Sequence, residues 1–148
     1  MNVEIANLQK HYKIKSSVIT RVVKEVLGKK YDGTKLSIAF VDNNEIKKLN
    51  NRYFNSNDIT DVIAFPSSNH KSSLNGEIVV SVEMAVDTAG KENIDVEAEI
   101  ILYVVHGLLH LMGYRDGNRS DAEIMHNKES KILKALGYNV PTVKDGFH

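Results

Sequence analysis

The chain has 148 residues, of which 42% are hydrophobic and 26% charged, and this balance is typical of a single globular domain. It contains no cysteine, which excludes disulfides and thiolate metal ligands and leaves imidazole nitrogen and oxygen as donors to any metal. The formal net charge of +0 excludes a strongly basic chain, and no stretch approaches the roughly 18 apolar residues that span a bilayer. The N-terminus has no apolar run of signal-peptide length, so we expect one cytoplasmic domain over residues 1–148 with no membrane partner.

Hydrophobic periodicity predicts a strand, a helix and a second strand in the first part of the chain. A short strand is expected over residues 3–6. Ser16 or Ser17 can cap a helix whose apolar residues form one stripe, and Gly28 is placed to end it. Apolar side chains alternate with small ones over residues 36–40, which predicts a strand.

A second helix is predicted directly after this strand. Asp42 and Glu45 have the spacing of a capping box, which marks a helix start. Ile46, Leu49 and Tyr53 follow at helical spacing, so we expect Tyr53 to lie in the core together with the two aliphatic residues.

Two more strands and a helix are predicted in the middle of the chain. Residues 61–65 form a short apolar run that Pro66 ends, and residues 67–75 are polar and predict a surface loop. The alternating pattern of residues 76–82 predicts another strand, and a helix is expected over residues 84–91.

The next helix is unusual because residues 100–111 are apolar on nearly every side, which predicts a buried central helix. Asp95 can cap its start, and Gly113 is placed to end it in a left-handed turn. Ser120 and Glu123 then have capping-box spacing for a last helix. The predicted fold class is α+β, with a small mixed β-sheet packed by several helices and a buried central helix.

Two histidines on the central helix predict a metal site. His106 and His110 are four residues apart, which places both imidazoles on one face, one turn apart. A turn at Gly113 would return the chain so that Asp116 supplies a third ligand, and three protein ligands with an open position are typical of catalytic zinc. His126 on the last helix is a rival third ligand, although its polar neighbours predict a solvent-facing side chain.

Gly107 separates this motif from the zinc-protease pattern H-E-x-x-H, in which a glutamate follows the first histidine. That glutamate is the general base of peptide hydrolysis, and no carboxylate replaces it here. Phosphodiester cleavage is easier to reconcile with the site, because a metal can polarise a phosphoryl oxygen and a nearby cation can stabilise the developing charge. A metallopeptidase remains an alternative, since the spacing of the ligands also suits that chemistry.

The segment His106–Tyr114, H-G-L-L-H-L-M-G-Y, resembles the signature H-G-x-L-H-L-x-G-Y-D-H of the YbeY family of rRNA-maturation endoribonucleases. Residues Leu49–Pro66 are similar to a second family block, and Gly76–Ser81 to a third. The resemblance implies a mixed sheet with several helices, one metal ion of the zinc type and cleavage of single-stranded RNA. It also implies a role in small-subunit rRNA maturation and ribosome quality control, with rRNA or the small subunit, and not DNA, as partner.

The chain departs from the family pattern in three places that matter for chemistry. The third histidine of the family falls at Asp116 and the preceding aspartate at Arg115, while the arginine after the tyrosine falls at Phe54. The family's loop aspartate falls at Asn57, with Asp58 beside it, so a shift of one residue could restore it. A carboxylate can bind zinc, but it makes harder ions such as Mn²⁺ more plausible.

Two arginines are candidates to replace the missing cation. Arg52 is the tentative catalytic residue, on the condition that its helix has already ended there, and Arg115 beside the third ligand is the other. The loss of the family's arginine also keeps open a third class of function, a non-catalytic ribosome-binding factor whose metal is structural.

Overall fold

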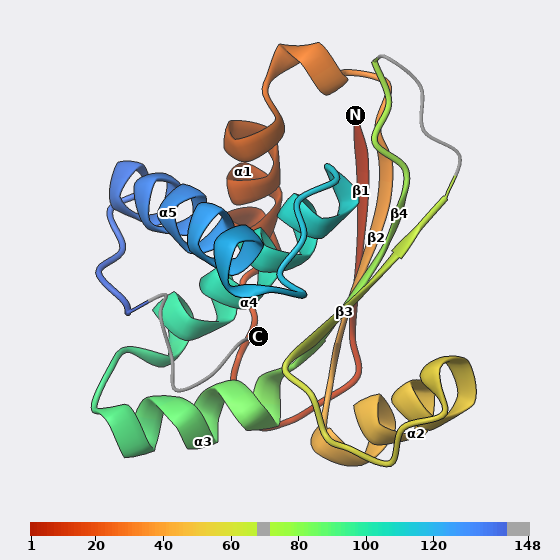
Figure 1. Cartoon of the computed structure of the whole chain (residues 1–148), viewed down its shortest axis with the longest axis vertical. Helices are drawn as coiled ribbons and strands as arrows, with labels where there is room; N and C mark the ends of the chain where they lie inside the picture. Colours follow the sequence, from red (N-terminus) through yellow and green to blue (C-terminus); the bar gives the residue numbers. More distant parts are fainter. Residues whose placement is uncertain (68–71, 142–148) are drawn as a thin grey trace.

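The computed structural model of the chain describes residues 1–67 and 72–141, and these form one sheet with helices on both sides (Figure 1). The strands are β1 (Asn2–Asn7), β2 (Lys35–Val41), β3 (Val62–Pro66) and β4 (Gly76–Ser81). The helices are α1 (Ser16–Leu27), the short 3₁₀ helix η1 (Lys29–Tyr31), α2 (Asn43–Phe54), α3 (Val82–Glu92), α4 (Val96–Leu111) and α5 (Arg119–Ala135). No helix among the described residues is long and apolar enough to cross a bilayer.

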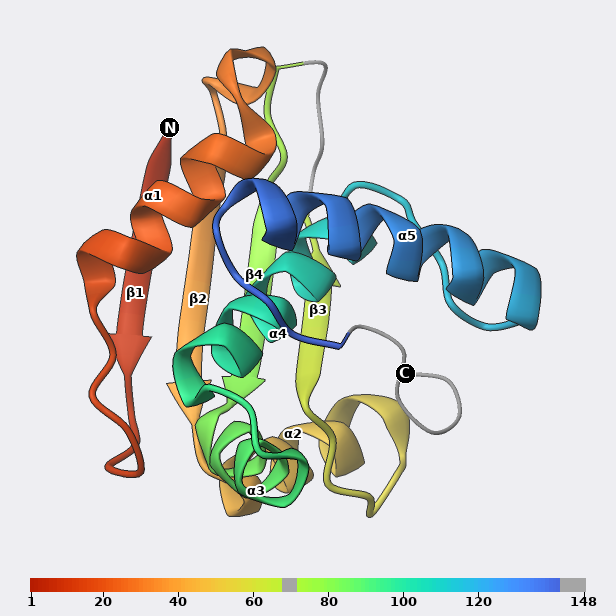
Figure 2. The same ribbon diagram turned by 90° about the vertical axis from the view of Figure 1, so that its left-hand side faces the viewer.

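The sheet is mixed, as predicted, and its strand order is β1-β2-β4-β3. Strands β1, β2 and β4 run parallel, whereas β3 pairs antiparallel with β4 and forms an edge of the sheet. Helices α1, α4 and α5 lie on one face, and Figure 2 shows them in front of the strands. Helix α2 lies on the opposite face, where Ile46 packs in a small second core with Val41, Ile63 and Val79.

Helix α4 forms the centre of the main core. Every residue from Ala98 to Leu109 is buried, because the helix contacts the sheet, α1, α3 and α5. Asp95 caps its start by accepting a hydrogen bond from the Ala98 amide at 3.0 Å, as predicted. At the other end Gly113 has φ of 102°, a left-handed conformation that favours glycine, so the predicted reversal of the chain after α4 is confirmed.

The structure corrects several local predictions. Tyr53 is 56% exposed, because α2 covers only one end of the outer sheet face and turns this position toward solvent. Helix α5 is capped by Asn118, whose side chain accepts from the Asp121 amide, so it begins before the predicted capping box.

The strand boundaries near the site also differ from the prediction. The last strand ends at Ser81, because the Ser81 hydroxyl accepts from the Met84 amide and starts α3. Strand β3 begins at Val62 and not at Asp61, and it ends at Pro66, which is its last residue; an edge strand tolerates the missing N–H. Part of the predicted loop over residues 67–75 lies outside the described residues.

Gly107 is a point where α4 lies close to the sheet. A Cβ atom at this position would lie 2.8 Å from Cγ2 of Ile78, a fully buried residue of β4. That methyl group belongs to a branched side chain in a packed core, so it has no free volume to move into. The absence of a side chain at position 107 therefore sets the distance between the central helix and the sheet.

We expect Gly107→Ala to destabilise the domain by a net of up to about 2 kcal/mol, because overpacking costs about 1–3 kcal/mol and is offset by the roughly 1 kcal/mol gained in helix propensity. Urea unfolding followed by circular dichroism measures this change. Gly90→Ala is the matched control, since Gly90 lies on the exposed side of α3 with nothing near its Cβ position. The control should stabilise by about 0.5–1 kcal/mol, and equal effects of the two variants would contradict the role given to Gly107.

Candidate metal centre

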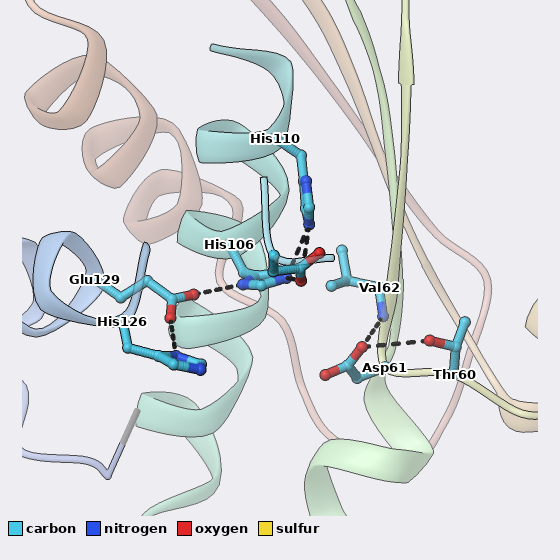
Figure 3. Close-up of polar contacts among 8 residues, drawn as sticks. Thr60, Asp61, Val62, His106, His110, His126 and Glu129 are labelled. Atoms are coloured by element: carbon cyan, nitrogen blue, oxygen red, sulfur yellow. Dashed lines mark hydrogen bonds and ion pairs between the residues drawn. The ribbon is translucent and has the colours of Figure 1, made fainter. Parts of the chain in front are cut away.

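Three side chains converge at the C-terminal end of α4. His106 Nε2 lies 3.0 Å from His110 Nε2, and both nitrogens approach the same oxygen, Oδ2 of Asp116, at 3.2 and 3.3 Å. One ligand atom from each residue lies within 4.8 Å of the other two, so the group could hold a metal ion. The structure therefore brings together the three residues that the sequence predicted as ligands, and Figure 3 shows the two imidazoles on one side of α4.

Local structure explains why these three side chains meet. His106 and His110 are one helical turn apart, and their rings pack edge to face with centroids 4.6 Å apart. After α4 the amide of Gly113 donates to the His110 carbonyl, and that of Tyr114 donates to the Leu109 carbonyl. These bonds close the turn and return Asp116 alongside the helix.

Burial makes the group closed on one side and accessible on the other. The His106 side chain is 5% exposed, whereas those of Asp116 and His110 are 17% and 32% exposed. Two imidazole nitrogens and one carboxylate oxygen are donors that zinc accepts, and the oxygen also suits Mn²⁺. The donor set thus fits a divalent ion that can be reached from solvent.

The charges of the group are strongly coupled. Burial alone would lower the pKa of His106, but its hydrogen bonds with Asp116 and Glu129 outweigh burial and raise it to about 9. Burial and the adjacent positive His106 lower the pKa of His110. Burial would raise the pKa of Asp116, but its hydrogen bond to His106 and the charges of both imidazoles lower it. A metal bound by these side chains would compete with protons for the imidazole nitrogens, so its affinity would depend on pH.

A buried carboxylate lies behind the group. Glu129 on α5 is fully buried, and its Oε2 lies 2.6 Å from Nδ1 of His106 (Figure 3). Its other oxygen lies 3.0 Å from Nδ1 of His126, which is itself buried. A carboxylate on the second ring nitrogen is the usual partner of a metal-binding histidine, because it fixes the orientation of the ring.

The structure thus corrects the prediction for His126 and adds Glu129, which sequence reasoning missed. His126 is not solvent-facing, and the ligand group contains Asp116 in its place. A signal was available in the sequence, because the buried stripe of α5 includes two polar positions. Its members are Ala122, Met125, His126, Glu129 and Leu133.

A cleft of about 790 Å³ opens beside the candidate ligands, between the turn after α4, strand β3 and the end of α2. Arg115 lines this cleft together with His110 and Asp116. Arg52 is not among its lining residues in the described part of the chain, and α2 continues to Phe54, so the condition for Arg52 is not met. The lining is completed by Asn50, Phe54, Thr60, Val62, Ile63, Ala64, Pro66, Leu111, Gly113 and Tyr114.

Asp61 fixes the backbone at the start of β3. Its Oδ1 accepts a hydrogen bond from the Val62 amide at 2.8 Å (Figure 3). Its carbonyl accepts one from the Ser81 amide. Thr60 donates to the same carboxylate at 3.4 Å. These contacts give the Thr-Asp pair a structural role, because they position the edge strand that forms one wall of the cleft.

Comparisons with known proteins identify the family. The family model described as Endoribonuclease YbeY matches residues 4–137. Proteins named Endoribonuclease YbeY from Carboxydothermus hydrogenoformans and Syntrophus aciditrophicus are 36% and 38% identical over 90% and 93% of this chain, and over 96% and 92% of their own lengths. The protein of that name from Finegoldia magna is 32% identical over 93% of this chain and 95% of its own.

The fold also matches a solved structure. A protein from Thermotoga maritima, determined in solution, superposes with a TM-score of 0.63 over 97% of both chains, and at 23% identity this likeness concerns the fold alone. The sequence relatives, the family match over nearly the whole chain and the shared fold agree. The chain belongs to the YbeY family of endoribonucleases.

Proposed function

We propose that this protein is a metal-dependent endoribonuclease that cleaves single-stranded RNA. The proposal depends on one observation, the convergence of two imidazoles and a carboxylate at the wall of an open cleft. Family membership supports RNA as the substrate. By the same resemblance we propose a cytoplasmic role in small-subunit rRNA maturation and ribosome quality control, with one zinc ion held by His106, His110 and Asp116.

The residues around the cleft suit phosphodiester chemistry. A divalent ion at this site would supply a Lewis acid that polarises a phosphoryl oxygen. Arg115 lies beside Asp116 in the same cleft and can stabilise negative charge that develops on the phosphate. Lys47, Lys48 and Arg52 on α2 are exposed but do not line this cleft, so among its lining residues Arg115 is the Lys or Arg side chain that can contact a phosphate there.

Packing at Gly107 argues against the metallopeptidase alternative. In the zinc-protease pattern a glutamate occupies this position as the general base. Here the Cβ atom of any side chain would lie 2.8 Å from Ile78, so no carboxylate fits without moving the helix off the sheet. Position 107 therefore provides no carboxylate to take a proton from the attacking water and deliver it to the leaving amine.

The exposure of the ligands argues against a purely structural metal. Structural zinc sites are closed by four protein ligands, whereas this group offers three, and two of them line a cleft. This open side favours an enzyme over a ribosome-binding factor with a structural ion.

We expect His110→Ala to abolish both metal retention and RNA cleavage, because it removes one of three ligands. Zinc affinity should fall by more than the roughly 10–100-fold that loss of a neighbouring hydrogen bond costs. Metal analysis of the purified protein and cleavage of a single-stranded oligonucleotide in the same samples measure both effects, with Asp116→Ala in parallel. His11→Ala is the control, since His11 is exposed near Glu83 and outside the group. RNA cleavage by metal-free His110→Ala protein would defeat the proposal.

Glu129→Gln should weaken zinc binding by about 10–100-fold, because a neutral amide orients and polarises His106 less well than a carboxylate. Competition with a chromophoric chelator gives the affinity. Glu123→Gln, an exposed glutamate on the same helix, is the control and should bind zinc as the wild type does. If both variants bind zinc equally well, Glu129 does not support the metal ligand.

Arg115→Ala should lower kcat by about 10²–10³-fold if its guanidinium stabilises the developing charge. Arg52→Ala should change kcat by no more than about threefold, as for an exposed charge at the periphery. Steady-state cleavage of a defined oligonucleotide compares the two variants. A larger loss in Arg52→Ala would return the catalytic role to Arg52, whose guanidinium lies 5.4 Å from the Tyr53 ring centroid.

A further inference from the structure

We propose that Phe54 is the platform on which one unpaired base of the RNA stacks, and that this contact sets the position of the strand in the cleft. The inference rests on the proposed function and deepens it. It assigns a substrate-binding role to an aromatic residue that lines the cleft and that the proposed chemistry does not use.

Phe54 is unusually exposed for a phenylalanine. It is the last residue of α2 and is 55% exposed, although phenylalanine is among the residues most often buried. Its ring is held in place, because it stacks on Phe65 of β3 with centroids 5.9 Å apart and an angle of 20° between the planes. A ring that is fixed by a parallel neighbour and open to solvent is preorganised to accept a further flat ring.

Phe54 shares its cleft with the candidate chemical groups. The same lining includes Arg115, Asp116 and His110, so a bound strand that enters the cleft can touch both ends of it. Asn50 also lines the cleft, and its side-chain amide donates to the Asp58 carbonyl, which ties the loop after α2 to the helix. Single-stranded RNA suits this arrangement, because its bases can be splayed out and stacked on aromatic side chains while the phosphates follow the cations.

Comparison with Tyr53 distinguishes base stacking by Phe54 from a role in shielding the sheet from solvent. It is 56% exposed and contacts the same Phe65, edge to face at 5.2 Å. However, Tyr53 lines a different groove, on the outer face of the sheet beside Glu4 and Glu77. If the two aromatic residues only protected Phe65, their removal would have similar effects. If Phe54 binds a base, removal of the Phe54 ring should weaken RNA binding, whereas removal of the Tyr53 ring should not.

The first test measures binding without cleavage. The probe is an uncleavable 2′-O-methyl oligonucleotide with 2-aminopurine at one position, scanned along the strand, and the readouts are fluorescence anisotropy and quenching. For Phe54→Ala we expect affinity to fall about 5-fold to 150-fold, the range for loss of one base–aromatic stack, and quenching at one position to disappear. Phe54→Trp should restore both signals.

Tyr53→Ala and Ile124→Ala are the matched controls, because Ile124 is 55% exposed on α5 and lines neither groove. Both should bind the probe within twofold of the wild type, an interval narrower than the loss of about 5-fold for one stack. Circular dichroism of each variant establishes that it is folded. Binding of the probe by folded Phe54→Ala as tightly as by the wild type would overturn the inference, as would an equal loss in Tyr53→Ala.

The second test uses a cleavable oligonucleotide with one abasic residue at the quenched position. We expect this lesion to raise KM for the wild type by the same factor as Phe54→Ala does on the intact strand, with kcat changed less than KM. The lesion should have no further effect in Phe54→Ala, because the stacking contact is already lost. A wild type that cleaves no RNA would overturn the proposed nuclease, whereas a wild type that cleaves intact and abasic strands alike would overturn only the stacking role.

Discussion

The burial of α4 on all sides is the constraint on which the rest of the structure depends. A helix with solvent on one face can place its polar residues there, but α4 has no such face over most of its length. Any imidazole on it must therefore find partners inside the protein. His106 does so on both ring nitrogens, with Asp116 on one side and Glu129 on the other.

These partners give the group two sides with different properties. On the inner side, Glu129 and His126 are buried and hold the His106 ring in one orientation. On the outer side, His110 and Asp116 border the cleft and stay accessible. Rigid support behind a ligand and access in front of it are what a reactive metal site needs, because the donors must stay fixed while substrate enters.

The sequence predicted those features that follow from local periodicity and spacing. The central helix, its glycine turn and the convergence of His106, His110 and Asp116 all follow from patterns within about one or two helical turns. The exposure of Tyr53 could not be read this way, because helical spacing shows which residues share a face but not how far the sheet extends beneath it.

The contact between Glu129 and His106 was beyond sequence reasoning for a related reason. The two residues are 23 positions apart and lie on helices whose packing is set by the whole core. His126 looked exposed because its sequence neighbours are polar, yet helix α5 turns it inward beside Met125. Pairings between elements depend on tertiary packing, which one sequence without its relatives does not reveal.

Three of the positions at which the chain departs from the family pattern lie in one cleft, so their charges can be compared together. By the resemblance to the family signature, Asp116 falls where the pattern has a histidine, Arg115 where it has an aspartate and Phe54 where it has an arginine. Over these three positions, with the histidine counted as neutral, the formal charge of this chain equals that of the pattern. All three residues line the same cleft, so the charges act on the same bound strand. In this chain the guanidinium of the cleft lies on the turn after α4, next to the Asp116 carboxylate, and an aromatic ring open to solvent lies at the end of α2.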